Sequence, residues 1–519
     1  MCYHRVGDPQ ALDVLVFDSP TERETVFSVD VSDDDRWVVV AGSRGSSEKS
    51  EVHLIDRSTA GAPVPLFTGF TSAYSFIQEA GGRLYFHTDH EAPRGRIVSV
   101  DPLRRDRAPT EIVAESADKL SAAMIVHHSI VAAYLHDASD RVRLFGLDGV
   151  DLGSIALPGI GSLAGMTGRP GDRELFLGFT SFTDPPTNYR YDFTAGTLTP
   201  SPIGPPGMGQ AALAREGGND TDEAANAAPP VRGFRLQPEE SSASAIESPV
   251  DPDAYETSQV WYTSKDGTKV SMFLVHRKGL ERDGQRPVLL SGYGGFNVCL
   301  TPGFDPSNFI LLDAGGIYAV ANLRGGGEYG EAWHEAGTFE RKQNVFDDFI
   351  AAAEWLTASG WSRADKIAIE GGSNGGLLTG AVMIQRPDLF GAVVCRVPVA
   401  DMLRYHLFTV GRFWISEYGS ADSPDQFPYL LAYSPYHNVK DGAAYPPILI
   451  TTADTDDRVS PGMAKKFAAR LQAAAGARSV VLIRVETKAG HGAGKPVSKL
   501  IEEDADIFSF LFTFLGVES

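Results

Sequence analysis

The sequence predicts a doubly wound, mostly parallel α/β domain that follows an all-β domain of the propeller type. Three observations support this prediction. Short apolar runs recur at a nearly constant step in the first 200 residues. From about residue 251 onward, strand-like and helix-like segments alternate. Between one such strand and the helix after it, Gly371–Gly375 has the pattern G-x-S-x-G, which is typical of a sharp turn around a serine.

The size and composition of the chain limit the class of protein to which it can belong. A chain of 519 residues is too long for one ordinary core, so two domains are expected. A hydrophobic content of 43% and a charged content of 22% are typical of a folded, soluble protein. The net charge of −21 argues against nucleic acid or an anionic membrane as a partner. No stretch has the length and purity of a membrane span, and residues 1–10 contain no apolar signal core.

The three cysteines are Cys2, Cys299 and Cys395, an odd number at scattered positions. This usage predicts reduced thiols in a cytoplasmic protein rather than a framework of disulfides. No C-x-x-C pair is present, so we expect no zinc site. The function expected below needs no metal and no cofactor.

The first 200 residues are predicted to form a partial β-propeller. The apolar markers Trp37, Leu84, Ile130 and Leu175 follow one another at steps of 47, 46 and 45 residues. Such a step fits the length of one propeller blade. The runs that contain these markers are Arg36–Ala41, Arg83–His87, Ile125–Leu135 and Glu174–Phe179. A β-sandwich with evenly spaced hairpins is the alternative.

Residues 201–250 are rich in small residues, proline and acids, and poor in aromatics, which predicts a disordered insertion or linker. Residues 251–519 are then the predicted α/β domain. It begins with a hairpin around Asp266-Gly267. The expected strands are Val288–Ser291, Ile317–Asn322, Ile367–Ile369, Ala392–Cys395, Pro447–Thr452 and Val480–Val485. The expected helices are Val345–Thr357, Leu377–Met383, Met463–Ala473 and Ile507–Phe514. We expect Asp347 and Asp348 to interact with the dipole of their helix.

Ser373 lies between the strand Ile367–Ile369 and the helix Leu377–Met383. In a nucleophile elbow, this turn exposes the serine hydroxyl above the sheet, and the flanking glycines avoid side-chain clashes. The alternative is an ordinary glycine-rich turn with a serine that takes no part in chemistry.

Two more motifs follow later strands, where chemistry in such sheets is located. Asp454, Asp456 and Asp457 follow one strand, and His491 follows the next. The chain order Ser, Asp, His is that of the α/β-hydrolases. A neutral imidazole can take the serine proton and return it to the leaving group, and a carboxylate holds the imidazole in the required tautomer. Spacing alone leaves the choice among the three aspartates open. An exposed loop histidine is the alternative for His491.

Five longer motifs carry a resemblance to a known family. They are S-G-Y-G-G-F-N at 291–297, N-L-R-G-G-G-E-Y-G at 322–330, G-G-S-N-G-G at 371–376, T-A-D-T-D-D-R-V at 452–459 and T-K-A-G-H-G-A-G-K-P at 487–496. With these motifs, the chain closely resembles the prolyl oligopeptidase family of serine peptidases from residue 251 to its end. The resemblance implies a propeller that covers the mouth of an α/β-hydrolase domain.

The resemblance also implies roles for single residues. It implies a triad of Ser373, Asp456 and His491, and so selects one of the three aspartates. It assigns the oxyanion hole to the hydroxyl of Tyr293 and the backbone N–H of Asn374. Arg458 resembles the arginine that holds a substrate carbonyl, and an ion pair with Asp454 or Asp457 is its alternative.

A pocket for proline is implied as well. Trp414 resembles the flat surface on which a proline ring stacks, with Tyr418 nearby. Phe296, Val399 and Val459 would line the sides. An apolar, aromatic slot suits a pyrrolidine ring, which has no hydrogen-bond donor. Core packing is the alternative for Trp414 and Phe296.

The resemblance implies seven blades and a preceding segment that packs on the hydrolase domain. About 200 residues before the linker provide for four or five blades, so we expect an incomplete propeller. The function we expect is cleavage of short proline-containing peptides after proline, by a monomer. Two alternatives stay open. One is a hydrolase of other specificity, such as an esterase or a peptidase that cleaves after basic residues with Glu417 as a pocket carboxylate. The other is an inactive, truncated form that acts as a binding protein.

Overall fold

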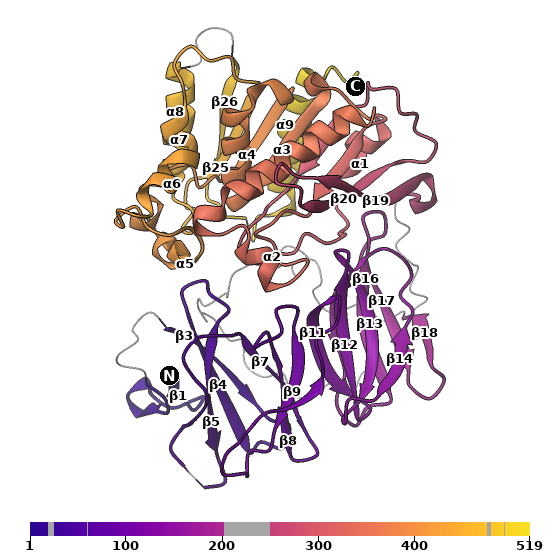
Figure 1. Cartoon of the computed structure of the whole chain (residues 1–519), viewed down its shortest axis with the longest axis vertical. Coiled ribbons are helices and arrows are strands. Elements are labelled where there is room, and N and C mark those ends of the chain that lie inside the picture. Colours follow the sequence, from indigo (N-terminus) through magenta and orange to yellow (C-terminus); the bar gives the residue numbers. More distant parts are fainter. Residues whose placement is uncertain (19–24, 60, 202–249, 475–478, 493, 519) are drawn as a thin grey trace.

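The computed structural model describes residues 1–18, 25–59, 61–201, 250–474, 479–492 and 494–518. The β-sheets of the first 200 residues lie below the α/β part of the chain in Figure 1. The predicted linker, residues 201–250, falls almost entirely outside the described residues. Within the described residues, no helix is both long enough and apolar enough to cross a bilayer.

Four antiparallel sheets of four strands each make up the first part of the chain. In each sheet, every strand pairs with the next strand along the chain. The first sheet contains β3 (Thr25–Val31), β4 (Trp37–Arg44), β5 (Ser50–Asp56) and β6 (Val64–Phe67). The second contains β7 (Tyr74–Ala80), β8 (Arg83–Thr88), β9 (Arg96–Val100) and β10 (Thr110–Val113). The third contains β11 (Lys119–Val126), β12 (Ser129–His136), β13 (Ser139–Gly146) and β14 (Asp151–Ile155). The fourth contains β15 (Ser162–Thr167), β16 (Glu174–Thr180), β17 (Thr187–Asp192) and β18 (Thr197–Pro200).

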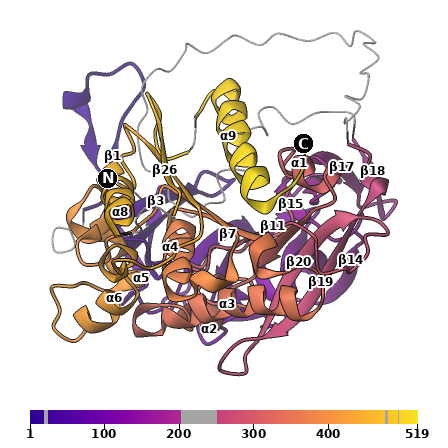
Figure 2. The same cartoon turned by 90° about the horizontal axis from the view of Figure 1, so that it is seen from above.

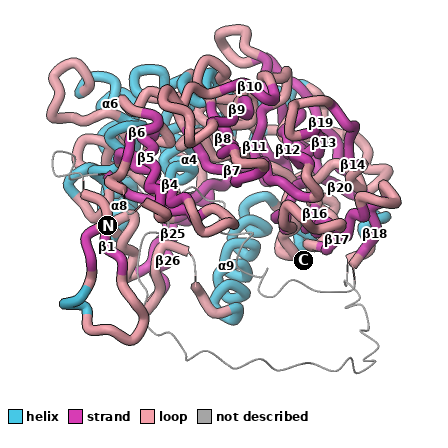
Figure 3. Tube along the Cα trace, turned by 90° about the horizontal axis from the view of Figure 1, so that it is seen from below, coloured by secondary structure: helices cyan, strands magenta, loops and turns pink. Residues whose placement is uncertain are grey.

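These sheets are propeller blades, as predicted. Each of the four repeat markers lies in the second strand of its sheet, namely β4, β8, β12 and β16. Seen from below, the sheets follow one another in chain order (Figure 3). Successive sheets bury their apolar faces against each other, for example Trp37 and Leu54 against Phe86. A short pair, β1 (Cys2–Tyr3) with β2 (Val14–Leu15), precedes the first sheet.

The run Ile125–Leu135, predicted as one apolar segment, is a hairpin instead. β11 ends at Val126 and β12 begins at Ser129. The two residues between them, His127 and His128, have φ values of 51° and 54°. A two-residue hairpin turn with positive φ at both positions normally uses glycine or asparagine. The histidines take that conformation without a sequence signal for it, which is why the turn was missed.

An eight-stranded sheet forms the second part, in the order β19-β20-β22-β21-β23-β24-β25-β26. β20 pairs antiparallel with both β19 and β22, and all other neighbouring strands pair parallel. The bounds of the first four strands are β19 (Tyr255–Thr263), β20 (Lys269–Arg277), β21 (Val288–Ser291) and β22 (Ile317–Ala321). Those of the last four are β23 (Ile367–Gly372), β24 (Ala392–Arg396), β25 (Ile448–Ala453) and β26 (Val481–Glu486). The predicted hairpin is β19-β20, with Gly267 at φ 90° in its turn.

Helices cover both faces of this sheet, as expected of a doubly wound fold (Figure 2). The longer helices are α3 (Gln343–Ala358), α4 (Asn374–Gln385), α8 (Pro461–Ala474) and α9 (Val497–Leu515). The shorter ones are α1 (Asn308–Asp313), α2 (Glu331–Glu335), α5 (Ile415–Tyr418), α6 (Phe427–Tyr433) and α7 (Pro435–Asn438). Leu290 packs with α3, α4 and α8, whereas its neighbour Leu289 packs with α1 and α9. Alternate side chains of one strand thus build the two cores.

The role expected for Asp347 and Asp348 was wrong. α3 begins at Gln343, so both acids lie beyond its first turn. Asp348 has a fully buried carboxylate that accepts two hydrogen bonds from the guanidinium of Arg324, with Nη2–Oδ1 at 2.6 Å and Nε–Oδ2 at 2.9 Å. The second partner of Arg324 is Asp266, in the β19-β20 turn. The pair therefore joins three elements rather than complementing the helix dipole.

Replacing Asp348 by alanine is expected to lower the free energy of unfolding by about 3–5 kcal/mol, because it leaves the buried Arg324 without its main partner. Asp347→Ala is the matched control. That carboxylate pairs with the exposed Lys265 at 3.3 Å, an interaction worth about 0–1 kcal/mol. Urea unfolding of both variants, followed by fluorescence, measures the difference. Equal shifts of the two midpoints would contradict this account of Arg324.

Candidate active site

The serine turn has the geometry of a nucleophile elbow. Ser373 stands between β23 and α4 with φ 57° and ψ −112°, a strained conformation for a residue with a side chain. Its backbone N–H donates to the carbonyl of Arg396 at 2.9 Å, and its side chain is partly exposed. A Cβ at Gly371 would lie 2.4 Å from the carbonyl oxygen of Gly375, and one at Gly375 would lie 2.9 Å from that of Gly292. The glycines are therefore needed for the close approach of backbone segments.

An acid and an imidazole meet at the ends of the next two strands of the sheet. Asp456 follows β25, His491 follows β26, and His491 Nδ1 lies 2.8 Å from Asp456 Oδ2. The carboxylate of Asp456 is fully buried, and the imidazole is 12% exposed. Asp454 and Asp457 are exposed, and within the described residues neither forms an ion pair with His491. Among the three aspartates considered, Asp456 thus makes the contact.

Backbone hydrogen bonds hold this pair in place. Asp456 Oδ1 accepts from the N–H groups of Arg458 at 3.0 Å and Val459 at 2.9 Å, which leaves Oδ2 for the imidazole. Thr455 ties the two loops together, because its hydroxyl donates to the carbonyl of Ala489 at 2.6 Å. Its backbone N–H donates to the same carbonyl at 3.3 Å. Sequence reasoning missed Thr455, since its partner lies on another strand's loop.

The structure brings His491 to Asp456 but not to Ser373. Among the described residues, no hydrogen bond joins the Ser373 hydroxyl to the His491 ring. With Nδ1 facing the carboxylate, Nε2 is the nitrogen left to exchange a proton with a hydroxyl. In unliganded hydrolases this bond is often long and shortens in the substrate complex.

Asn374 joins the elbow to the loop after β21. It is the first residue of α4, where backbone N–H groups have no acceptor within the helix. Its side-chain Nδ2 donates to the carbonyl of Tyr293 at 2.6 Å, and its Oδ1 accepts from the hydroxyl of Tyr418 at 2.8 Å. Tyr293 is thereby held next to the serine turn, on the side where hydrolases of this fold place an oxyanion donor.

Aromatic side chains gather beside the elbow. The rings of Trp414 and Phe296 are partly exposed and meet edge to face, with centroids 6.5 Å apart. The ring of Tyr405 stacks behind Trp414 at 6.2 Å. Tyr418 is fully buried and meets Phe296 edge to face at 5.3 Å, so it supports Phe296 from behind. Trp414 and Phe296 also pack on the main core, so core packing accounts for only part of their surface.

Val399 and Val459 are both buried, at 1% and 2% exposure. The backbone N–H of Val399 donates to the carbonyl of Ser373 at 3.4 Å. Arg458 is partly exposed, and its carbonyl accepts from the Thr409 hydroxyl at 2.7 Å.

Glu417 does not act as an open pocket carboxylate in this structure. It is 3% exposed, and its oxygens accept from the N–H of Phe296 and contact His334 Nε2, each at 2.8 Å. Among the described residues, no cluster of three or more His, Cys, Asp or Glu side chains could hold a metal ion.

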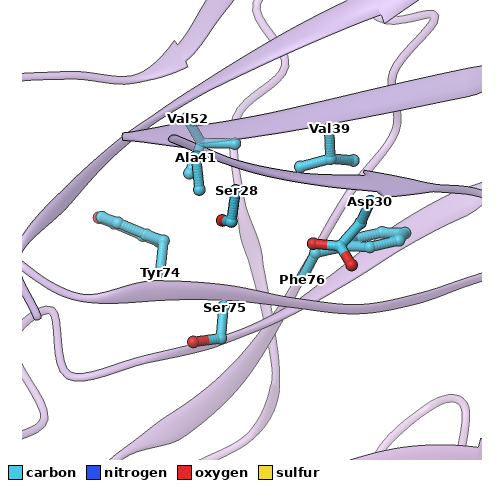
Figure 4. Close-up of a pocket in the computed structure, with 8 residues that line it drawn as sticks. All are labelled: Ser28, Asp30, Val39, Ala41, Val52, Tyr74, Ser75 and Phe76. Atoms are coloured by element: carbon cyan, nitrogen blue, oxygen red, sulfur yellow. The ribbon is translucent and has the colours of Figure 1, made fainter. Parts of the chain in front are cut away.

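The pocket in Figure 4 lies away from this site. It has a volume of about 140 Å³ and lies between the first two blades. Its lining residues are Ser28, Asp30, Val39, Ala41, Val52, Tyr74, Ser75 and Phe76. None of them belongs to the residues described above, so we locate the chemistry from the elbow and the acid–imidazole pair.

Comparisons with known proteins identify the family. Residues 302–518 match the prolyl oligopeptidase family, and residues 1–202 match its N-terminal beta-propeller domain. The chain is 37% identical over 520 residues to the prolyl endopeptidase of Elizabethkingia meningoseptica, covering all of this chain and 67% of the relative.

Solved structures give the same result. One, from a structural and mechanistic study of two prolyl endopeptidases, is 41% identical, has a TM-score of 0.88 and covers all of this chain and 70% of its own. Another is prolyl oligopeptidase B from Galerina marginata bound to a 35-residue hydrolysis and macrocyclization substrate. It is 32% identical, with a TM-score of 0.87, and the match covers all of this chain and 69% of that one. The chain thus spans about two thirds of its relatives' length, and the described residues hold four blades. On this evidence, the chain belongs to the prolyl oligopeptidase family.

Proposed function

We propose that this chain is a serine endopeptidase that hydrolyses short peptides on the carboxyl side of proline. One observation carries the proposal: the buried Asp456 holds His491 at 2.8 Å, at the same edge of the sheet as the strained Ser373 turn. A hydroxyl on an elbow and, at the same edge of the sheet, an imidazole held by a carboxylate are the groups that acyl transfer by a serine requires.

The proposed reaction uses these residues in turn. Ser373 Oγ attacks the carbonyl carbon of the proline residue while His491 Nε2 takes the hydroxyl proton. The negative charge that develops on the carbonyl oxygen accepts hydrogen bonds from the Tyr293 hydroxyl and the Asn374 N–H. The C–N bond then breaks, and His491 gives its proton to the departing amine. Water attacks the acyl-enzyme with His491 again as the base, which releases the peptide acid and restores Ser373.

The aromatic slot supports the choice of proline. We propose that the proline ring stacks on Trp414, with Phe296, Val399 and Val459 beside it and Tyr418 behind Phe296. Arg458 would donate to a carbonyl of the bound peptide. The family relatives that carry the name prolyl endopeptidase support the same specificity.

A comparison of blocked Gly-Pro, Gly-Ala and Gly-Arg fluorogenic peptides tests this specificity. We expect Gly-Pro to be the best substrate, and Trp414→Ala to lower its kcat/KM by about 10- to 200-fold, because the variant loses the surface under the ring. Trp261→Ala is the matched control, since this tryptophan is 42% exposed on β19. Preference for arginine would contradict the proposal and favour the basic-specific alternative. A folded protein that neither cleaves peptides nor reacts with a fluorophosphonate would favour an inactive binding form.

We also propose that the enzyme is cytoplasmic and monomeric. Its three cysteines are all unpaired, which supports a reducing compartment. Gel filtration of the purified chain tests the oligomeric state, and an elution volume of a dimer would contradict it.

A further inference from the structure

We propose that a buried set of charges, Lys342, Glu417 and His334, positions the loop Tyr293–Asn297, which carries both the oxyanion donor and a wall of the proline pocket. The inference rests on the proposed function, and it adds three positioning residues to it. None of the three is expected to touch the substrate.

The loop Tyr293–Asn297 has a backbone that requires support. Gly294, Phe296 and Asn297 have φ values of 61°, 57° and 58°. For Phe296 and Asn297 this left-handed conformation costs about 1–3 kcal/mol each, so it persists only where the surroundings hold it.

Two charged side chains supply that support from within the α/β part. Glu417 Oε1 accepts from the N–H of Phe296 at 2.8 Å, and Lys342 Nζ donates to the carbonyl of Gly294 at 2.7 Å. The two hydrogen bonds hold the loop at the residues on either side of Gly295. Hydrogen bonds from charged groups to buried backbone are about twice as strong as neutral ones. Glu417 is 3% exposed and Lys342 is 1% exposed, so water does not compete with them.

The charges balance one another. Lys342 Nζ lies 3.8 Å from Glu417 Oε1, and His334 Nε2 lies 2.8 Å from Glu417 Oε2. The other ring nitrogen of His334 faces Glu331 at 3.2 Å. Burial opposes charging of His334, but the two carboxylates outweigh it and raise its pKa to about 10. Burial lowers the pKa of Lys342 to about 8.

The propeller holds the same loop from the other side. Asn297 Nδ2 donates to Glu48 Oε2 at 2.6 Å, and Lys119 Nζ lies 3.3 Å from Asn297 Oδ1. The N–H of Glu331, the first residue of α2, donates to the carbonyl of Pro93 at 2.7 Å. In Figure 1, α2 accordingly lies at the boundary between the two parts. The charged set thus anchors the loop where the blades meet the hydrolase sheet.

Because one loop carries both Tyr293 and Phe296, its displacement should affect rate and selectivity together. We therefore expect Glu417→Ala to lower kcat for a blocked Gly-Pro peptide by about 10²–10³-fold, the effect of losing one oxyanion donor. The ratio of kcat/KM for Gly-Pro over Gly-Ala should fall by about tenfold or more as the pocket loses its wall. Glu417→Gln keeps an oxygen for the N–H of Phe296, so it should retain more of both.

Asp388→Ala is the matched control, because it removes an exposed carboxylate that pairs with Arg386 and not with the loop Tyr293–Asn297. It should leave both quantities unchanged. A lower melting temperature for Glu417→Ala with unchanged kcat and selectivity would overturn the inference, since a merely structural role predicts that result. If Glu417→Ala shows no cooperative melt, Lys342→Met removes the Gly294 anchor and one of the cations near Glu417, while the bond from the Phe296 N–H to Glu417 remains, and the same two readouts decide.

The rate of Ser373 labelling by a fluorophosphonate separates this inference from the proposed function. That reagent needs the oxyanion donors but no proline pocket. A wild-type chain that is labelled but does not cleave Gly-Pro refutes the proposed specificity, and slower labelling of Glu417→Ala still supports the inference. A wild-type chain that shows neither activity refutes both.

Discussion

Replacing Ser373 by alanine is expected to lower kcat for a blocked Gly-Pro peptide by about 10⁶-fold. The variant has no Oγ to form the acyl-enzyme, so His491 and Asp456 are left without a group to act on. Ser373 also sits at φ 57° in the elbow, a conformation that alanine adopts at a similar cost, so the fold should survive. The residual rate then reports what the oxyanion donors and substrate binding achieve alone.

Release of the fluorophore at saturating peptide concentration, for both proteins, measures this loss. Ser359→Ala, at the end of α3, serves as the control for a serine outside the site. Labelling by a fluorophosphonate should occur in the wild-type chain and be absent from Ser373→Ala. A variant that kept a tenth of the wild-type rate would show that another group attacks the peptide.

Replacing Asp456 by asparagine is expected to lower kcat by about 10⁴-fold with little change in KM. The reason is visible in the contacts of the carboxylate. Oδ1 accepts from two backbone N–H groups, those of Arg458 and Val459, and an amide can only offer its oxygen there. The NH₂ group of the asparagine must then face His491 Nδ1. That nitrogen becomes an acceptor, so the ring proton moves to Nε2, the atom that has to take the proton of Ser373.

Parallel variants test this choice of acid. Asp454→Asn and Asp457→Asn change exposed carboxylates of the same loop and should retain nearly full kcat. Steady-state kinetics of the three variants with one Gly-Pro peptide make the comparison direct. If either neighbour lost more activity than Asp456→Asn, the acid would have to be reassigned.

The fold could be predicted from local patterns. Blade markers such as Trp37 and Leu84 recur in the second strand of each sheet, because a four-stranded meander repeats its buried positions at a fixed chain length. The elbow is encoded in five neighbouring residues, Gly371–Gly375, whose conformations depend on steric limits within the turn itself. The hairpin turn at His127 was not predicted, because the positive φ there is stabilised by the pairing of the two strands rather than by the residue type.

The site was only partly contained in the sequence. Strand order placed an acid loop beside a histidine loop, but the residues alone left Asp454, Asp456 and Asp457 equivalent, and the resemblance to a family made the choice. In the structure, the backbone N–H groups of Arg458 and Val459 turn one carboxylate inward to His491. That orientation depends on how the loop after β25 folds against its neighbour.

Contacts between distant segments were decided by the tertiary structure alone. Glu417 lies 83 residues from His334 and 121 from Phe296, and neither spacing has a period that a helix or strand would reveal. The sequence by itself determined the serine turn, the strands and the chain order of the chemistry, because these depend on backbone preferences within a few residues. The packing of α2, α3 and α5 decided which charged side chains meet beneath the Tyr293 loop. Burying an unpaired charge is costly, so charged groups that are remote in sequence are buried together as pairs.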